Sequence, residues 1–266
     1  MLPQLEGHSS GEFHYNMKIN PIGKGWFKDW FNSAEYLNVY GHRDDKDAKK
    51  LLELIIRYSN LPDNGWVLDA ACGAGRHSIY LASKGYRVVG FDLSKTLLKK
   101  AKQDAEKKSV SIDLLCADLR KIYFKKKFNL IFNLFTSFGY FETDEENFAF
   151  VNTAYSLLEE NNFYILDYMN VNFLLNNLIA ETNRKIKGKI IVEKREIVGE
   201  RVVKEIIIKN GNNKQVFYES VRMYTKDNII ENFKKIGFLV EKVFGNYDGE
   251  EFHEQNSSRL ILFFRK

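Results

Sequence analysis

Between residues 66 and 170 the chain alternates between short apolar runs and amphipathic segments, and no other feature limits its possible folds as strongly. The apolar runs have the length and composition of buried strands and lie at 66–71, 87–92, 111–118, 128–135 and 162–169. Three intervening segments have helical spacing, namely 76–85, 96–108 and 144–160. Apolar strands that alternate with helices are typical of a parallel sheet covered by helices on both faces. We therefore expect an α/β fold.

Residues at two helix ends support this assignment. Gly85 is a normal C-terminal stop for the first helix, and Ser94 is placed to cap the second. The apolar residues of the second helix share one face and are Leu97, Leu98, Ala101 and Ala105.

The pattern changes after residue 180. Three β-type runs at 190–198, 201–209 and 215–224 are separated by VGE and NGNN, and Asn-Gly between such runs is a strong hairpin signal. We predict that residues 181–224 form an inserted antiparallel β subdomain, acting as a lid over a ligand or as a dimer surface. The main domain is then predicted to comprise residues 61–180 and 225–266, with a helix at 226–236 and strands at 238–245 and 258–266. Residues 1–25 are predicted to be a flexible arm, and residues 26–60 a helical cap.

Composition indicates an ordinary globular protein. Hydrophobic residues make up 44% of the chain, yet no run reaches the roughly 18 consecutive apolar residues that a membrane span needs. Cys72 and Cys116 cannot build a disulfide framework or a metal site, and the first residues lack a secretory pattern, so we expect a cytoplasmic protein without a bound metal. The net charge of +5 is mild, and the densest basic segment, 120–128, is interpreted as solvated surface. We therefore expect no membrane or nucleic-acid partner.

A turn rich in small residues separates the first two predicted strands. Gly73 and Gly75 would let the backbone approach a ligand where the strand becomes a helix. Asp92 ends the next strand, where a carboxylate can accept hydrogen bonds from ribose hydroxyls. Dinucleotide-binding proteins share both features. However, Ser78 occupies the third glycine position of their fingerprint, and a carboxylate at Asp69 would repel a pyrophosphate.

The segment DAACGAGRHS at 69–78 resembles the D-x-G-C-G-x-G signature of class I S-adenosylmethionine-dependent methyltransferases, with Ala71 in place of the first glycine. Three more segments match this family in the same order: GFDLS at 90–94, CADLR at 116–120 and the fourth strand with its following loop at 128–141. The match runs from about Trp66 to Lys266 and is interrupted by the β insertion, as in bacterial small-molecule members. It implies a Rossmann-like, seven-stranded sheet sandwiched by helices, with its last strand antiparallel.

The resemblance also implies a cofactor, S-adenosyl-L-methionine, and the residues that hold it. Asp69 would meet the methionine amino group, while Gly73 and Gly75 would lie along the methionine backbone. Asp92 and its neighbour Leu93 would hold the ribose. The adenine would contact the Asp118 carboxylate and the Leu119 amide, and Asn133 would lie near the methyl group.

Each of these residues also has a purely structural interpretation. Asp69 and Asp92 could cap the turns that follow them, and the two glycines could be ordinary turn residues. Asp118 could pair with Arg120, and Asn133 could be a turn former. For His77 and Cys72 we favour packing roles over catalytic ones.

An acceptor would bind beyond the carboxyl ends of the strands. Candidate catalytic residues at this edge are Tyr140, Tyr168 and His253, and further candidate pocket residues are Asn170, Tyr247 and Asp248. The inserted sheet is expected to present one face carrying Tyr218, Arg222 and Tyr224. The sequence thus indicates a methyltransferase acting on a small molecule. The alternatives are an RNA methyltransferase, for which neither an N-P-P-Y-like tetrapeptide nor a Pro-Cys pair is present, or a non-catalytic cofactor-binding protein. A homodimer is one expected use of the inserted sheet.

Overall fold

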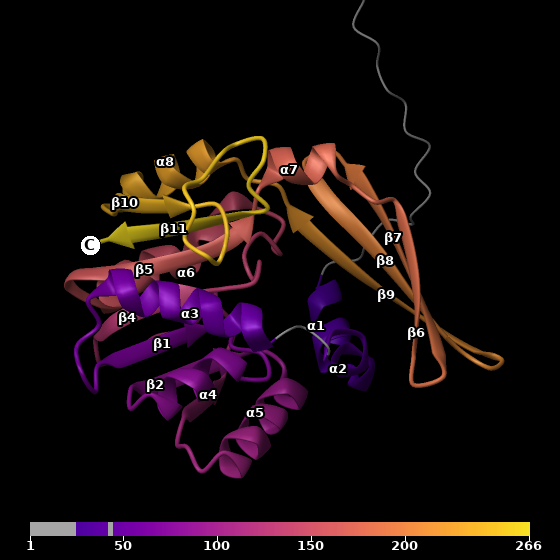
Figure 1. Ribbon diagram of the computed structural model, residues 1–266, viewed down its shortest axis with the longest axis horizontal. Coiled ribbons are helices and arrows are strands. Elements are labelled where there is room, and N and C mark those ends of the chain that lie inside the picture. The colour runs from indigo at the N-terminus through magenta and orange to yellow at the C-terminus, as the bar shows by residue number, and fades with distance from the viewer. Residues whose placement is uncertain (1–24, 42–44) are drawn as a thin grey trace, which may run out of the picture.

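A computed structural model describes residues 25–41 and 45–266 of the chain, so most of the predicted arm falls outside the described residues. Its centre is a seven-stranded sheet in the order β10-β11-β5-β4-β1-β2-β3 (Figure 1). The strands are β1 (Trp66–Ala70), β2 (Arg87–Asp92), β3 (Asp113–Cys116), β4 (Phe128–Asn133), β5 (Leu158–Met169), β10 (Leu239–Phe244) and β11 (Arg259–Arg265). Strands β1 to β5 pair in parallel, whereas β11 runs antiparallel between β5 and β10. The predicted fold class is confirmed.

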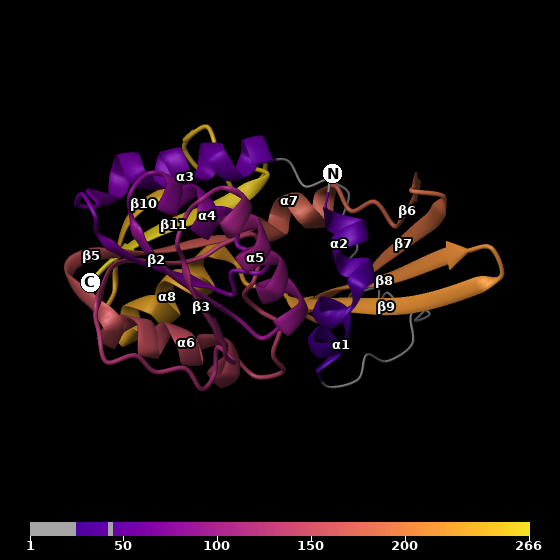
Figure 2. The same ribbon diagram turned by 90° about the horizontal axis from the view of Figure 1, so that it is seen from below.

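Helices cover both faces of this sheet, as Figure 2 shows. On one face lie α3 (Asp45–Ser59) and α4 (Arg76–Ser83), with α5 (Lys95–Lys107) beside α4. On the other face lie α6 (Asp144–Leu157) and α8 (Lys226–Ile236). Successive strand residues point to opposite faces, so Val67 packs with the first group and Leu68 with the second, and both are fully buried. Two buried faces explain why the strands are apolar throughout.

The insertion is a separate four-stranded antiparallel sheet in the order β6-β7-β8-β9. Its strands are β6 (Glu181–Ile186), β7 (Lys189–Val198), β8 (Arg201–Asn210) and β9 (Asn213–Arg222). The sequence predicted three strands here and missed β6, an edge strand whose run ETNRKI contains a single apolar residue. Turns at Gly188, Gly199 and Gly211, all with positive φ, connect the strands.

Two short helices, α1 (Trp26–Asn32) and α2 (Ala34–Tyr40), lie between the inserted sheet and the main domain (Figures 1 and 2). Trp30 and Val39 pack against Ile191 and Ile206 of the inserted sheet in a small core of their own. Two side chains at the start of α5 hold α1 on its other side, since Ser94 Oγ donates to the Phe31 carbonyl at 2.6 Å and Thr96 Oγ1 to that of Asn32 at 3.0 Å. A further short helix, α7 (Val171–Asn176), leads from β5 to the insertion.

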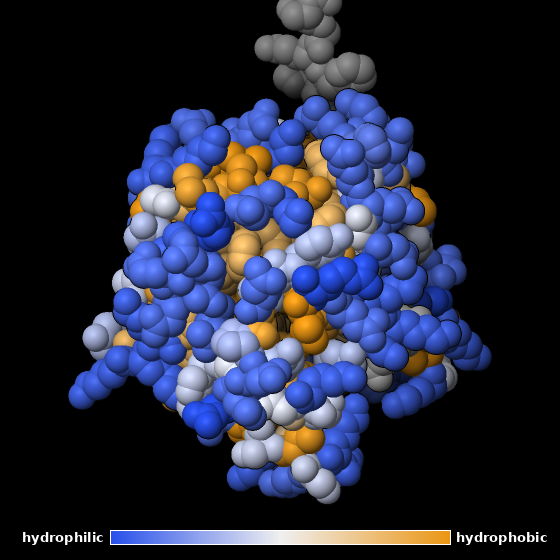
Figure 3. All heavy atoms as spheres, turned by 60° about the vertical axis from the view of Figure 1, so that its left-hand side comes forward, coloured by the Kyte–Doolittle hydropathy of each residue, from blue (hydrophilic) through white to orange (hydrophobic). Residues whose placement is uncertain are grey.

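The side of the molecule that lies at the left of Figure 1 is largely hydrophilic at its surface, with apolar residues visible between polar ones (Figure 3). Among the described residues, no helix is both long and apolar enough to cross a membrane.

Ser94 has two structural roles, because its Oγ also accepts from the Leu97 amide at 3.2 Å and so caps α5 as predicted. We expect Ser94→Ala to lower the free energy of unfolding by about 2 kcal/mol, since it removes a cap and a buried tertiary hydrogen bond. Thr143 caps α6 at an exposed position, and its side chain makes no tertiary hydrogen bond to any described residue, so Thr143→Ala should cost about 1 kcal/mol. Urea denaturation measures both, and equal losses would contradict the role of Ser94 in holding α1.

Candidate functional site

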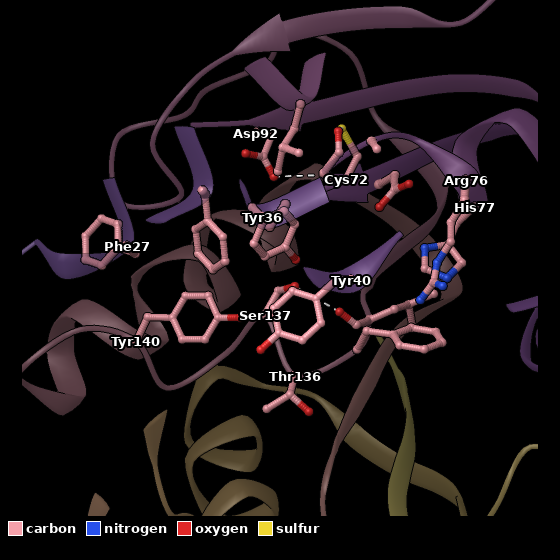
Figure 4. A pocket seen from close by; sticks show the side chains of 18 of the residues that line it. Phe27, Tyr36, Tyr40, Cys72, Arg76, His77, Asp92, Thr136, Ser137 and Tyr140 are labelled. Atoms are coloured by element: carbon pink, nitrogen blue, oxygen red, sulfur yellow. Dashed lines mark hydrogen bonds between the residues drawn. The ribbon is translucent and has the colours of Figure 1, made fainter. Parts of the chain in front are cut away.

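A cavity of about 1250 Å³ opens at the carboxyl ends of β1, β2 and β4. The main domain forms one side, and α1, α2 and the inserted sheet form the other. In the view of Figure 4, the side chains of Tyr36, Tyr40 and Tyr140 project into the space between Asp92 and Thr136. Because pockets for single small ligands typically measure about 300–1000 Å³, this cavity has room for two ligands together.

The glycine turn forms one wall of the cavity. Ala71, Gly73 and Gly75 all have positive φ, at 59°, 56° and 74°, so the motif position at which the chain has alanine still adopts the left-handed conformation of a glycine. Gly73 lines the cavity, whereas Gly75 does not. A Cβ on Gly75 would lie 2.8 Å from the Cβ of Ala101, so this glycine lets α4 approach α5. Its predicted contact with the cofactor stays a prediction.

Asp92 ties the glycine turn to the start of α5. Its Oδ2 accepts from the Gly73 amide at 2.9 Å, and its Oδ1 accepts from the Ser94 amide at 2.8 Å. Burial raises the pKa of this carboxyl, and the backbone hydrogen bonds oppose that shift. Each carboxylate oxygen can accept more than one hydrogen bond. Asp92 can therefore hold both loops and still accept hydrogen bonds from the hydroxyls of a ligand in the cavity that it lines.

Asp69 lines the cavity one strand away and accepts from Ser78 Oγ at 2.6 Å. Burial is the main cause that raises its pKa to about 7; the Ser78 hydrogen bond acts in the opposite direction, and the negative charge of Asp92 raises it further. A buried carboxyl of this kind would ionise readily when a cationic group binds beside it.

Asp118 pairs with Arg120, as the structural interpretation of Asp118 from the sequence allowed. Its oxygens accept from the Arg120 amide at 2.9 Å, Nε at 3.0 Å and Nη2 at 2.7 Å, and these bonds lower the pKa of the carboxyl. Arg120 also donates to Glu146 at 2.6 Å and lies over the ring of Phe141. Asp118, Leu119, Leu93 and Phe141 nevertheless all line the cavity.

The loop after β4 is strained and held by a carboxylate that sequence reasoning missed. Phe135 and Thr136 both have positive φ, at 56° and 60°. The Phe135 amide donates to Asp167 Oδ2 at 2.9 Å, and the Thr136 amide to the Asp167 carbonyl at 3.0 Å. Arg259 Nε donates to Asp167 Oδ1 at 2.8 Å, and its Nη2 to Thr136 Oγ1 at 3.1 Å. An acid within the apolar run 163–169 was the available signal.

His77 lies in the wall of the cavity, with its ring centroid 5.0 Å from that of Phe135. Burial lowers its pKa well below the usual range for histidine, so the ring is neutral at pH 7. Its Nε2 is buried and has no hydrogen-bond partner among the described residues. This packing agrees with the structural interpretation of His77, while Nε2 keeps the capacity to bind a ligand.

Three other predicted residues do not line the cavity. Asn133 is buried, and its Nδ2 donates to the Ala70 carbonyl at 3.4 Å. Tyr168 is fully buried in the core, and its hydroxyl donates to the Arg222 carbonyl. His253 is exposed in the loop before β11, away from the cavity lining.

Aromatic side chains form the wall opposite the glycine turn. Tyr140, the one catalytic candidate of the three that lines the cavity, packs edge-on against Trp26, with 5.2 Å between ring centroids. Phe31 contacts Tyr36 at 5.1 Å, and Tyr36 contacts Tyr40 at 5.1 Å. For Trp26, Phe31, Tyr36 and Tyr40 the sequence predicted a helical cap but no role in a site.

The inserted sheet turns the opposite face to the cavity from the one predicted. Glu219 and Val221 line the cavity, whereas the prediction placed Tyr218 and Arg222 there. Because strand side chains alternate, the apolar residues packed beneath α1 and α2 decide the orientation, and they share a face with Glu219. Tyr224 follows β9 and is buried beside Phe138 and Phe148. Tyr247 and Asp248 line the cavity as expected, while Asn170 instead holds the loop at 254–257 through two hydrogen bonds of 2.8 Å.

Comparison with known proteins agrees with the resemblance seen in the sequence. Residues 67–161 match a family described as a methyltransferase domain. The chain is 33% identical over 110 residues to a putative methyltransferase, YqeM, of Bacillus subtilis, covering 41% of this chain and 44% of that protein. It is 32% identical over 111 residues to the glycine/sarcosine N-methyltransferase of Aphanothece halophytica, covering 41% and 42%. The chain thus spans less than half the length of these two curated relatives.

Its fold extends further than this sequence similarity. The crystal structure of an S-adenosylmethionine-dependent methyltransferase from Clostridium acetobutylicum superposes with a TM-score of 0.75 at 18% identity, covering 87% of this chain and 97% of that one. The inserted sheet and the closing strands therefore belong to a known architecture.

The raised pKa of Asp69 predicts how stability depends on pH. The folded state keeps this proton up to about pH 7, whereas the unfolded state loses it near pH 3.8, so this group's contribution to stability falls as pH rises between those values. Asp69→Asn should therefore become more stable than the wild type by up to about 4 kcal/mol as pH rises from 4 to 8. Urea titrations at several pH values test this, with the exposed Asp63→Asn as control. Parallel curves for wild type and Asp69→Asn would contradict it.

The buried Asp167 should be among the most sensitive positions in the fold. Asp167→Asn removes the buried negative charge that pairs with Arg259 and weakens the hold on the strained loop, at a cost of about 3 kcal/mol. Glu241→Gln, which breaks an exposed ion pair with Arg265, should cost less than about 1 kcal/mol. Denaturation of the two variants measures the contrast, and losses of similar size would show that Asp167 does not hold the loop.

Proposed function

We propose that this chain, in which residues 67–161 form a class I S-adenosylmethionine-dependent methyltransferase domain, transfers the methyl group of S-adenosylmethionine to a small-molecule acceptor. The observation that carries the proposal is the position of Asp92, a buried carboxylate bonded to the glycine turn on the rim of a cavity with room for two ligands.

The residues around the cavity fit the cofactor. Asp92 keeps unused acceptor capacity on both oxygens for two ribose hydroxyls. Asp69, whose pKa of about 7 leaves it poised to ionise, suits an amino group. Leu93, Leu119 and Phe141 offer apolar surface for a flat base, with Asp118 and its Arg120 partner at the margin. Gly73 lines the cavity, where its backbone would lie beside the methionine part of the cofactor.

When bound, S-adenosylmethionine supplies a methyl group that is already electrophilic, so the protein needs mainly to align the acceptor and exclude water. The aromatic wall of Phe31, Tyr36 and Tyr140 excludes water from the side facing the inserted sheet. The strained loop at Phe135 and Thr136 fixes the opposite side. His77 Nε2, which is neutral and without a partner among the described residues, can accept a hydrogen bond there. Its low pKa makes it a weak base, which suits orientation better than proton removal.

The relatives support a small acceptor, since one of them is a glycine/sarcosine N-methyltransferase. An RNA acceptor would need a basic binding surface, which this cavity, walled by aromatic rings and by acids as well as bases, does not favour. A non-catalytic binding protein would bind the cofactor without turnover on any small molecule. We place the reaction in the cytoplasm, because Cys72 and Cys116 are free thiols and Cys116 is exposed. The homodimer stays a prediction.

Binding of S-adenosylhomocysteine tests the cofactor site. Asp92→Asn replaces one acceptor oxygen with an amide nitrogen, which faces either a backbone N–H or the ribose. We expect its affinity to fall by about 10- to 100-fold, as the loss of a buried hydrogen bond to a charged group implies. Isothermal titration measures this.

Asp113→Asn, on the exposed edge strand β3, serves as the control and should bind like the wild type. Circular dichroism shows whether the Asp92 variant remains folded. Equal affinities of folded Asp92→Asn and wild type would count against the proposed function.

A further inference from the structure

A row of charged side chains crosses the inserted sheet where it faces the cavity. Arg195 on β7 pairs in register with Lys204 on β8, and Lys204 pairs with Glu219 on β9. Cross-strand neighbours on one face lie side by side, so the three side chains form a continuous charged row. All three line the cavity.

The three side chains of the row are mostly shielded from solvent, and Lys204 and Glu219 are hydrogen-bonded to each other and to Tyr40. Lys204 Nζ donates to Glu219 Oε2 at 2.6 Å and to the Tyr40 hydroxyl at 2.8 Å, and that hydroxyl donates to Glu219 Oε1 at 2.7 Å. The side chains of Arg195, Lys204 and Glu219 are 20%, 19% and 17% exposed. Shielding a charge from solvent to this degree costs free energy unless an opposite charge pairs with it.

The charges do not match within the row and its direct partners. Glu193 is 3% exposed and accepts from both Arg195, at 2.6 Å, and Arg184, at 2.8 Å. Burial disfavours its ionised form, but Lys204, Arg184 and Arg195 together hold the pKa of Glu193 below its usual value, so it carries a negative charge. Two carboxylates, Glu193 and Glu219, therefore face three cations. Among the ion pairs of the described residues, this cluster beside the cavity has one more cation than it has carboxylates.

Arg195 also has donors to spare. Its guanidinium carries five N–H groups, and the structure gives hydrogen bonds from Nη2 to Glu193 and from Nη1 to Thr182 Oγ1 at 3.1 Å. Within the described part of the chain, Nε and the remaining N–H groups of this side chain have no acceptor. An arginine with open N–H groups is suited to a planar or tetrahedral oxyanion.

The charged row is distinct from the apolar residues of the inserted sheet that pack against α1 and α2. The apolar residues Ile191 and Ile206 on the same face are covered by Trp30 and Val39. On the same face, Val202 and Val221 line the cavity together with the row. The sheet holds α2 through Lys204 and Glu219 on Tyr40, through the Lys189–Glu35 ion pair and through Arg184 on the Val39 carbonyl. None of these bonds involves Arg195, so Arg195 is not explained by the attachment of α2.

We propose that Arg195 and Lys204 bind an oxyanion of the methyl acceptor, a carboxylate or a phosphate ester, so that the inserted sheet selects anionic small molecules. The term acceptor rests on the proposed function, whereas the anion site itself rests on the charged row. Arg195 supplies the open N–H groups, and Lys204 adds a positive charge at the same surface.

Matched pairs of probes test the proposal. Phenylacetate is compared with phenylacetamide, and phenyl phosphate with phenol, since the phenyl ring suits the aromatic wall. Binding of each is measured by isothermal titration, with and without saturating S-adenosylhomocysteine. We expect at least one anion to bind at least tenfold more tightly than its neutral partner, and the pair that shows it distinguishes carboxylate from phosphate.

Arg195→Gln should reduce that preference to less than threefold while leaving the affinity for S-adenosylhomocysteine within twofold of wild type. Lys194→Gln is the control, because it removes a positive charge one residue away on the opposite face of the same strand and should keep the preference. A preference that survives in folded Arg195→Gln would overturn the assignment, as would equal or absent binding of both anions and their neutral partners. Anion preference without S-adenosylhomocysteine binding would instead support the anion site and contradict the proposed function.

Discussion

A single buried carboxylate, that of Asp92, connects the two loops from which the rest of the site is built. By accepting from the Gly73 and Ser94 amides, it sets the distance between the turn after β1 and the start of α5. Ser94 then caps α5 and donates to α1, so the same connection extends to the helix that closes the cavity. Asp92 thus both holds these loops and keeps acceptor capacity for the hydroxyls of a ligand in the cavity.

Asp167 performs the corresponding task on the other side of the cavity. It is fully buried, and it joins the loop after β4 to β5 and to Arg259 of β11. The two consecutive left-handed residues, Phe135 and Thr136, each cost on the order of 1–3 kcal/mol, and strain of this kind persists only where neighbouring groups enforce it. The antiparallel strand β11 therefore contributes Arg259 to the site as well as a place in the sheet.

Much of this structure could be predicted from the chain, and the failures have physical causes. The strands, the helix at 226–236 and the Ser94 cap follow from local periodicity and end signals. The face of the inserted sheet was predicted wrongly because β9 has hydrophobic and charged residues on both faces, and its orientation depends on Trp30, nearly two hundred residues earlier in the chain. Tyr168 and Tyr140 look equivalent in sequence. The structure buries Tyr168, which lies in β5, and leaves Tyr140, in the loop after β4, at the cavity.

The pairing of α1 and α2 with the inserted sheet affects how this fold can diversify. Two segments far apart in the chain form one compact unit, joined through Glu219, Tyr40 and Lys204 and through an ion pair between Lys189 and Glu35 at 2.5 Å. Exchanging the insertion alone with that of another protein would leave these amino-terminal helices without their complementary surface. A change in the ligand preference of this side of the cavity therefore requires coordinated changes in α1 and α2 and in the insertion, while the side formed by the glycine turn can stay as it is.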